Sequence, residues 1–134
     1  MSRPAIPNDQ RLIVALDLPS GNEARELVEA LGDSVSFYKV GLELFTGADG
    51  FAVVDWLSTY GKQVFVDLKF FDVPATVARA VKQLRGRNIT FATVHGNDAI
   101  MQAAAEVSGD VGILAVTVLT SLDSADMRDL GFDC

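Results

Sequence analysis

The stretch "VFVDLKFFDVPATV", from Val64 to Val77, contains both a predicted strand and the beginning of a predicted helix. As far as Phe70 it is mostly apolar, which is typical of a strand buried on both faces of a parallel sheet. Pro74 suits the first turn of a helix, where the amide hydrogen that proline lacks is not needed. Three charged side chains interrupt this apolar sequence: Asp67, Lys69 and Asp72. The fold must therefore accommodate charges at the end of this strand.

The same alternation of strand and helix extends in both directions from this stretch. Apolar runs of strand length predict strands over 11–18, 35–41, 62–70, 89–96 and 111–120. Helix signals predict helices within 20–32, 49–61, 72–86 and 97–109, and a short acidic helix over 124–131. The first of these helices begins with Ser20 and Glu23, which have the spacing of a capping box.

Alternating strands and helices predict an α/β fold with a parallel sheet and right-handed crossovers. No G-x-G-x-x-G follows the first strand, so a dinucleotide-binding fold loses support. The alternative is a (β/α)8 TIM barrel, which takes roughly 250 residues. The 134 residues supply about five of its eight units. We therefore expect residues 1–134 to form a single domain, the N-terminal portion of such a barrel that stops early at Cys134.

Composition excludes several classes of partner and location. Hydrophobic residues make up 49% of the chain and charged residues 22%, which is ordinary for a globular protein. The net charge is -7 and the basic residues are scattered, which argues against nucleic acid or a membrane surface as a partner. Its basic segment 81–87 is interpreted as a solvated helix end. One cysteine, no signal peptide and no bilayer-length apolar run together predict a cytoplasmic protein.

Polar side chains mark the carboxyl ends of the predicted strands, which is where barrel enzymes carry their active sites. These residues are Asp17, Lys39, Asp67 with Lys69, His95, and Thr117 with Thr120. Asp67 and Lys69 are two residues apart on one strand, so alternation predicts that they face the same side. Asp72 and Thr76 are four residues apart, so they are expected on one face of the next helix.

Each of these residues also has a purely structural interpretation. Asp72 could be only the N-cap before Pro74, and Asp17 could cap the loop that follows it. Asp67 and Lys69 could form a structural ion pair, although buried pairs are costly. His95 could be a core histidine, and Thr120 a loop residue. The functional interpretation depends on the convergence of five residues at one end of the sheet: Asp17, Lys39, Asp67, Lys69 and Asp72.

The position of Lys69 between two carboxylates predicts its charge state. Burial opposes an ammonium by on the order of 4–7 kcal/mol in extreme cases. One ion pair at ~4 Å contributes roughly 4 kcal/mol at an effective dielectric constant of 20, so two carboxylates can offset that penalty. We expect Lys69 to be a buried ammonium that can donate a proton. A Schiff-base lysine needs the opposite arrangement, which weakens an aldolase interpretation.

The segment "VDLKFFD", Val66–Asp72, resembles the D-x-K-x-x-D motif of the orotidine 5'-monophosphate decarboxylase superfamily. The segments "LIVALDL", "FYKVGLELF" and "VTVLTS" resemble its first, second and fifth strands in the bacterial form. Sugar-phosphate decarboxylases and synthases of the superfamily share the motif but carry a glutamate where this chain has Lys39. The resemblance implies decarboxylation of orotidine 5'-monophosphate to uridine 5'-monophosphate in pyrimidine biosynthesis, by a homodimer that needs no metal or organic cofactor.

The resemblance also implies roles for the matching residues. Lys39, Asp67, Lys69 and Asp72 would form the family's lysine–aspartate array, with Lys69 protonating C6 of the pyrimidine. Asp17 and Lys39 would hold ribose hydroxyls, and Thr120 would meet the pyrimidine edge. Asp72 and Thr76 resemble the pair that enters the partner's site across the dimer interface. No role for His95 is implied.

One departure from the family concerns phosphate binding. The family holds the substrate phosphate with loops after strands seven and eight, including an arginine, and the 134 residues end before those strands. We therefore expect weak or absent activity in the isolated chain, because remote binding energy positions the reacting group. Two alternatives stay open at this point: a sugar-phosphate decarboxylase or synthase with a divalent metal, and a catalytically silent half-barrel.

Overall fold

The computed structural model describes residues 5–133, and its strands form one parallel five-stranded sheet. The strands are β1 (Val14–Ala15), β2 (Phe37–Gly41), β3 (Gln63–Phe70), β4 (Ile89–His95) and β5 (Gly112–Val116). Each strand pairs with the next one along the chain, in the order β1-β2-β3-β4-β5. This order is that of a (β/α)8 barrel, whereas a doubly wound sheet reverses at a switch point. The expected architecture, with about five strand–helix units, is confirmed.

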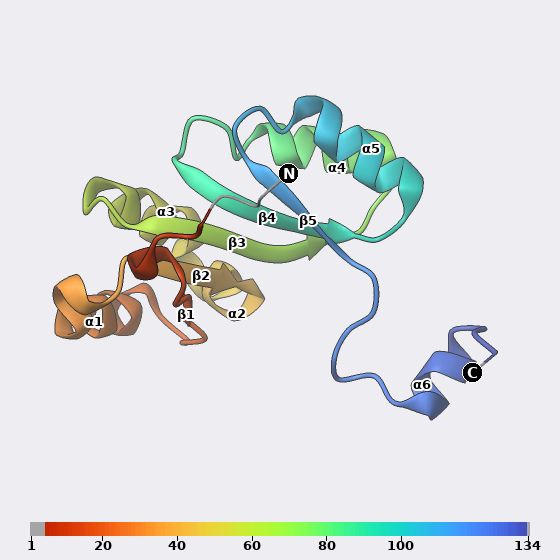
Figure 1. The fold of residues 1–134 in the computed structure, drawn as a ribbon, viewed down its shortest axis with the longest axis horizontal. Coiled ribbons are helices and arrows are strands. Elements are labelled where there is room, and N and C mark those ends of the chain that lie inside the picture. The colour runs from red at the N-terminus through yellow and green to blue at the C-terminus, as the bar shows by residue number, and fades with distance from the viewer. Residues whose placement is uncertain (1–4, 134) are drawn as a thin grey trace.

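Helices lie within all the predicted helix ranges. The helices are α1 (Gly21–Leu31), α2 (Leu42–Leu44), α3 (Gly50–Thr59), α4 (Pro74–Lys82), α5 (Asp98–Val107) and α6 (Ser124–Asp129). A π-helical turn, η3 (Phe45–Asp49), joins α2 to α3, and two short 3-10 turns are η1 (Asn8–Gln10) and η2 (Gly32–Ser34). The helical segment formed by α2 and the turn that follows it is one that the sequence signals did not predict. In Figure 1, α4 and α5 lie side by side along the sheet, while α6 lies apart from it beyond an extended segment. Within residues 5–133, no helix has the length and apolar character that a bilayer crossing requires.

Helices cover most of the outer face of the sheet. Six side chains at even positions of the three central strands have no solvent-exposed surface: Tyr38, Val40, Val64, Val66, Ala92 and Val94. The other even positions of these strands, Leu68, Phe70 and Thr90, are partly buried. Most of the six form one core with α3 side chains such as Val53 and Leu57, which are also completely buried. Because side chains alternate along a strand, the odd positions must face the barrel interior.

The inner face changes character along the strands. Near the amino ends, three aromatic rings are in contact: the centroid of Phe91 lies 6.0 Å from that of Phe37 and 6.2 Å from that of Phe65. Further along the same face, toward the carboxyl ends, the side chains become polar, with Lys39, Asp67 and Thr93. The inner face is therefore apolar at one end and charged at the other.

The edge strands are shorter than the sequence predicts. β1 contains two residues where a strand over 11–18 was expected, and β5 ends at Val116 although the apolar run continues to Thr120. Each of these strands has a neighbour on one side only in the described part of the chain, so fewer residues are held in the sheet. At the β4–β5 junction, Gly96 N donates a hydrogen bond to Val116 O at 2.8 Å. A Cβ at Gly96 would lie 2.8 Å from the same oxygen, so this close approach requires glycine.

Candidate active site

The carboxylate of Asp67, near the end of β3, is the centre of a charged cluster. Its Oδ2 atom lies 3.0 Å from Lys69 Nζ and 3.4 Å from Lys39 Nζ. Its Oδ1 atom accepts a hydrogen bond of 2.8 Å from Thr93 Oγ1 on β4. Three neighbouring strands thus supply groups to one carboxylate, which is itself buried. We call Lys39, Asp67 and Lys69 the lysine–aspartate cluster.

The surroundings of Asp67 keep it ionised. Burial by itself raises the pKa of this carboxyl group, because a charged form is less well solvated inside the protein. Hydrogen bonds from Lys69 and Thr93, together with the positive charges of Lys69 and Lys39, outweigh that effect and lower the pKa below its ordinary value. The cluster therefore presents a fixed negative charge between two lysine side chains.

A bulge at the end of β3 brings Lys69 to Asp67. Between the pairs Val66–Ala92 and Phe70–Val94, β3 advances by four residues while β4 advances by two. Lys69 has a φ angle of 48°, in the left-handed region that residues with side chains seldom adopt. The expected proximity of Asp67 and Lys69 is present, but simple strand alternation is the wrong explanation for it, since the strand is not regular there.

The expectation of a buried Lys69 ammonium is wrong for this chain. The side chain of Lys69 is 39% exposed and that of Lys39 is 28% exposed, whereas that of Asp67 is 11% exposed. No strand covers the inner face beyond β5 in the described residues, so the lysine ends reach solvent. The buried partner is the carboxylate, and its attraction for the lysines is weakened by solvent on their side.

Asp72 and Thr76 lie beside Lys69 but outside the cluster. Asp72 Oδ1 accepts a hydrogen bond of 2.6 Å from Val73 N, and Val73, not Asp72, is the N-cap of α4. The interpretation of Asp72 as a helix cap is therefore wrong. Lys69, Asp72 and Thr76 line one pocket of about 330 Å³. Within residues 5–133, Asp72 forms no ion pair with a lysine, so the expected four-residue array has three linked members in one chain.

Asp17 and Thr120 occupy different positions relative to the cluster. Asp17 is exposed, and its Oδ1 atom would lie 3.7 Å from a Cβ built on Gly41, at the end of β2. The N-cap of α1 is Ser20, whose hydroxyl accepts a hydrogen bond from Glu23 N. Thr120 is exposed, and it belongs to the segment between β5 and α6, which extends away from the sheet in Figure 1.

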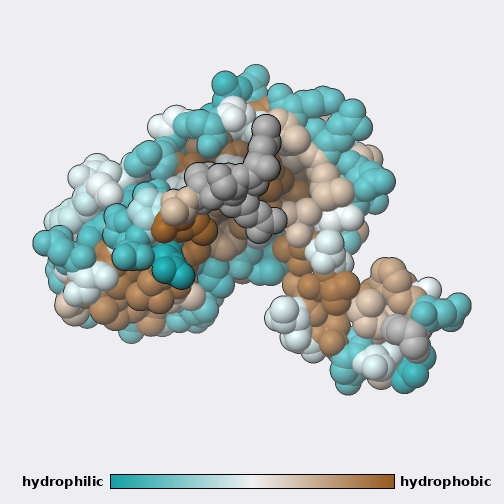
Figure 2. Space-filling view, in the orientation of Figure 1, coloured by the Kyte–Doolittle hydropathy of each residue, from teal (hydrophilic) through white to brown (hydrophobic). Residues whose placement is uncertain are grey.

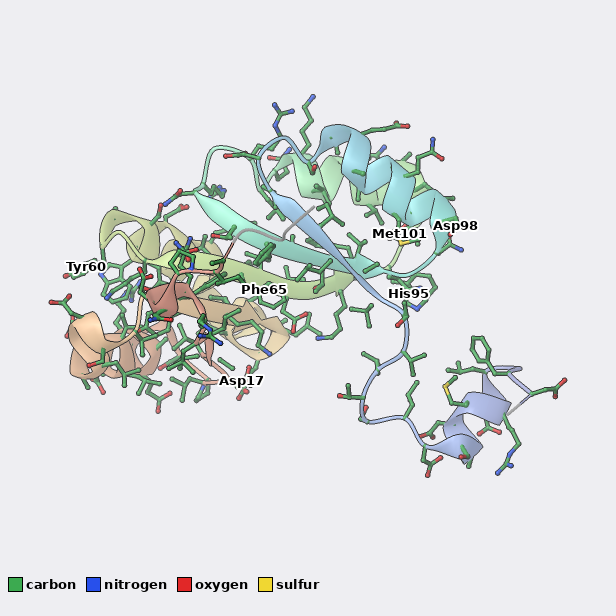
Figure 3. The ribbon with its side chains drawn as sticks, viewed as in Figure 1. Asp17, Tyr60, Phe65, His95, Asp98 and Met101 are labelled. Atoms are coloured by element: carbon green, nitrogen blue, oxygen red, sulfur yellow. The ribbon has the colours of Figure 1, made fainter. Side chains whose placement is uncertain are left out.

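His95 lies at the carboxyl end of β4, close to the point where β5 leaves the sheet (Figure 3). Its ring stacks on Phe71 with the centroids 4.2 Å apart. Its Nδ1 atom is buried and has no hydrogen-bond partner in the described part of the chain, so it is not a satisfied core histidine. His95 and Lys69 line a second pocket of about 530 Å³, whose other walls are mainly apolar. Figure 2 shows apolar surface on the segment between β5 and α6, which lines this pocket.

Known proteins share this arrangement of sequence and fold. The sequence profile of the Orotidine 5'-phosphate decarboxylase / HUMPS family matches residues 10–132. The chain belongs to this family. The resemblance seen in the D-x-K-x-x-D segment, Asp67 to Asp72, is thereby confirmed.

Individual members of the family are similar over the whole chain. Orotidine 5'-phosphate decarboxylase of Methylococcus capsulatus is 68% identical over 134 residues, which is 100% of this chain and 55% of the relative. That of Stenotrophomonas maltophilia is 50% identical, with 99% of this chain and 57% of the relative covered. The crystal structure of orotidine 5'-phosphate decarboxylase from Lactobacillus acidophilus superimposes with a TM-score of 0.80 at 36% identity, over 90% of this chain and 58% of that one. The chain spans about half the length of the curated relatives it matches.

Membership of the Orotidine 5'-phosphate decarboxylase / HUMPS family leaves the individual residue roles as predictions. Geometry links Lys39, Asp67 and Lys69 directly, and it places Asp72 and Thr76 around a pocket with Lys69. Sequence reasoning missed Thr93, whose hydroxyl donates a hydrogen bond to Asp67 of the cluster. A signal was present: Thr93 is a polar residue in the apolar run of β4, two residues before His95 and two after the inward-facing Phe91.

Proposed function

We propose that the chain carries the catalytic residues of an enzyme that converts orotidine 5'-monophosphate to uridine 5'-monophosphate, a step of pyrimidine biosynthesis in the cytoplasm. The observation that carries this proposal is the buried Asp67 carboxylate between Lys39 and Lys69, at the carboxyl ends of β2 and β3. Paired opposite charges at this end of a barrel suit a reaction in which a negative charge moves from a carboxylate to a carbon atom of the substrate.

The reaction breaks the bond between C6 of the pyrimidine and its carboxylate. Carbon dioxide leaves, the electron pair of the bond stays on C6, and Lys69 Nζ transfers a proton to C6. The neutral amine then regains a proton from water. The positive charge of Lys69 stabilises the carbanion as it forms, which is electrostatic catalysis by a preorganised group. Asp67 next to the substrate carboxylate would repel it by roughly 4 kcal/mol at ~4 Å, and the departure of carbon dioxide relieves that repulsion.

The remaining predicted residues would bind the substrate. Asp17 and Lys39 would hold ribose hydroxyls, since Asp17 follows β1, which pairs with the strand of Lys39. Thr120 would meet the pyrimidine edge only if the segment after β5 folds toward the cluster. Asp72 and Thr76 would enter the site of a partner in a homodimer, which suits two residues on the rim of the Lys69 pocket. No metal or organic cofactor is part of the proposal, because the side chains supply both charge and proton.

The phosphate of the substrate needs further protein. Since the chain spans about half the length of its relatives, we propose that turnover requires a longer polypeptide with eight strand–helix units. The test is a decarboxylation assay with orotidine 5'-monophosphate on the 134-residue chain and on the extended form. We expect activity in the extended form and little in the short one. Equal activity in both would contradict the need for a separate phosphate site.

Lys69→Ala in the extended form tests the proposed role of Lys69 as the proton donor. We expect turnover to disappear while the circular dichroism spectrum stays that of the parent, because the proton donor is lost and the fold is not. Lys82→Ala, which removes an exposed lysine from α4, is the matched control and should keep full activity. A Lys69→Ala enzyme with substantial activity would remove Lys69 from its role. Turnover of a sugar phosphate that depends on a divalent metal would favour the other branch of the family.

Mixed mutants test the shared site. Asp72→Asn removes the side chain proposed to enter the partner's site, and Lys69→Ala removes the proton donor of a subunit's own site. A mixture of the two proteins should regain partial activity, because each hybrid dimer has one site in which both groups are intact. No regain after mixing, with dimers present by analytical ultracentrifugation, would contradict the proposal that Asp72 serves the partner's site.

A further inference from the structure

We propose that Thr93 is a positioning residue that fixes the Asp67 carboxylate and the backbone of Lys69 with one hydroxyl group. Thr93 is 5% exposed and lies on β4, the strand that pairs with β3. Its Oγ1 atom donates to Asp67 Oδ1 at 2.8 Å and accepts from Lys69 N at 2.9 Å. A hydroxyl is the smallest side-chain group that can donate and accept at once.

The first contact sets the orientation of the Asp67 carboxylate. Both lysine ammonium groups contact Oδ2, while Thr93 holds Oδ1. Without the hydroxyl, Oδ1 would be a buried acceptor that has lost its partner, and the carboxylate could turn away from the lysines. The same hydrogen bond is one of the interactions that lower the pKa of Asp67.

The second contact stabilises an unusual backbone. Lys69 lies in the bulge of β3 with a φ angle of 48°. Such a conformation persists only where surrounding contacts hold it, and it occurs preferentially at functional sites. The hydrogen bond from Lys69 N to Thr93 Oγ1 is a contact of this kind, made across strands inside the bulge. Thr93 therefore determines where the Lys69 side chain begins, and so where its ammonium lies.

The catalytic consequence of this inference rests on the proposed function, but the positioning itself does not. Nuclear magnetic resonance on the 134-residue chain measures it without substrate. In Thr93→Val, which keeps the shape and loses the hydroxyl, we expect the Lys69 amide to exchange with solvent about tenfold faster. The pKa of Asp67 should rise toward its ordinary value. In Thr93→Ser, which keeps the hydroxyl, both quantities should stay close to those of the parent.

Two outcomes would overturn the proposal. One is a folded Thr93→Val chain in which Lys69 amide exchange and the Asp67 titration are unchanged. The other is found in the parent chain alone, and so does not depend on a variant that folds. We expect a slowly exchanging Thr93 hydroxyl proton with a cross-peak to the Lys69 amide proton, and a hydroxyl that exchanges freely with water would contradict the two contacts.

Kinetics in the extended, active form separate this proposal from the proposed function. We expect Thr93→Val to lower kcat at least tenfold with little change in KM, and Thr93→Ser to restore most of it. Thr90→Val, on the same strand and outside the cluster, is the control and should leave both constants unchanged. If decarboxylation is absent even in the parent, the proposed function fails while the resonance measurements still decide the role of Thr93. If decarboxylation is present and Thr93→Val keeps the parent's kcat, only the catalytic consequence is overturned.

Discussion

The two faces of the sheet differ in what covers them. On the outer face, side chains such as Val64 and Val66 are completely buried beneath helices. On the inner face, the corresponding odd positions carry aromatic rings at one end and the lysine–aspartate cluster at the other, where the two lysine side chains reach solvent. The side chains that stabilise the fold therefore lie mainly on the outer face of the sheet, and the charged side chains of the proposed site lie on the inner face. The outer layer forms the hydrophobic core, whereas the inner layer holds charged side chains that are partly exposed to solvent.

Removal of a buried leucine from the outer layer should have the largest effect. Leu57 lies in α3 and is fully buried against the outer face, so Leu57→Ala should lower the free energy of unfolding by about 2–5 kcal/mol. Leu114 on β5 is the matched control, because it pairs with Thr93 on the sheet and is 40% exposed. Leu114→Ala should cost under about 1 kcal/mol. Urea denaturation followed by circular dichroism measures both, and equal losses would contradict the separation of the two faces.

Much of this contrast could be predicted from the sequence. The apolar run before Asp67 predicts a buried strand, and the polar residues Lys39 and Asp67 themselves, toward the ends of apolar runs, correctly indicate a charged end of the sheet. The bulge at Lys69 could not be predicted, since hydrophobic alternation carries no signal for a left-handed residue. The role of Thr93 depends on the register between β3 and β4 across that bulge. The exposure of Lys69 and the early end of β5 depend on neighbouring strands, which an apolar run cannot reveal.

The charge of Asp67 should contribute to stability by a smaller amount that depends on pH. Its pKa is lowered in the folded chain, so its contribution is present above the unfolded pKa of about 3.9. That contribution is lost as the pH falls through the lower, folded pKa. Asp67→Asn should therefore reduce the free energy of unfolding by about 1–2 kcal/mol at neutral pH, discounted for the partly exposed lysines. The difference from the parent should shrink as the pH falls below about 3.9 and should disappear once the pH is below the folded pKa.

Urea denaturation at a series of pH values measures this difference. Asp55→Asn is a suitable comparison, because Asp55 pairs with Arg87 on the outside of the molecule and its side chain is 53% exposed. An exposed pair of this kind contributes about 0–1 kcal/mol, so its loss should be smaller at neutral pH. A pH-independent loss for Asp67→Asn would show that the carboxylate stabilises the fold through shape and not through charge, and the contrast between the faces would be weaker.

The smallest expected effect concerns the start of α1, which belongs to the outer layer. Ser20→Ala removes the hydroxyl that accepts from Glu23 N and should cost about 0.5–1 kcal/mol, whereas Ser20→Asp should retain the cap. Urea denaturation measures the loss. The Asp67 titration should be the same in both variants and the parent, because the cap belongs to the outer layer and the carboxylate faces the barrel interior. A shifted Asp67 pKa in Ser20→Ala would mean that a change in the outer layer reaches the cluster, and the two faces would then have to be treated as one coupled structure.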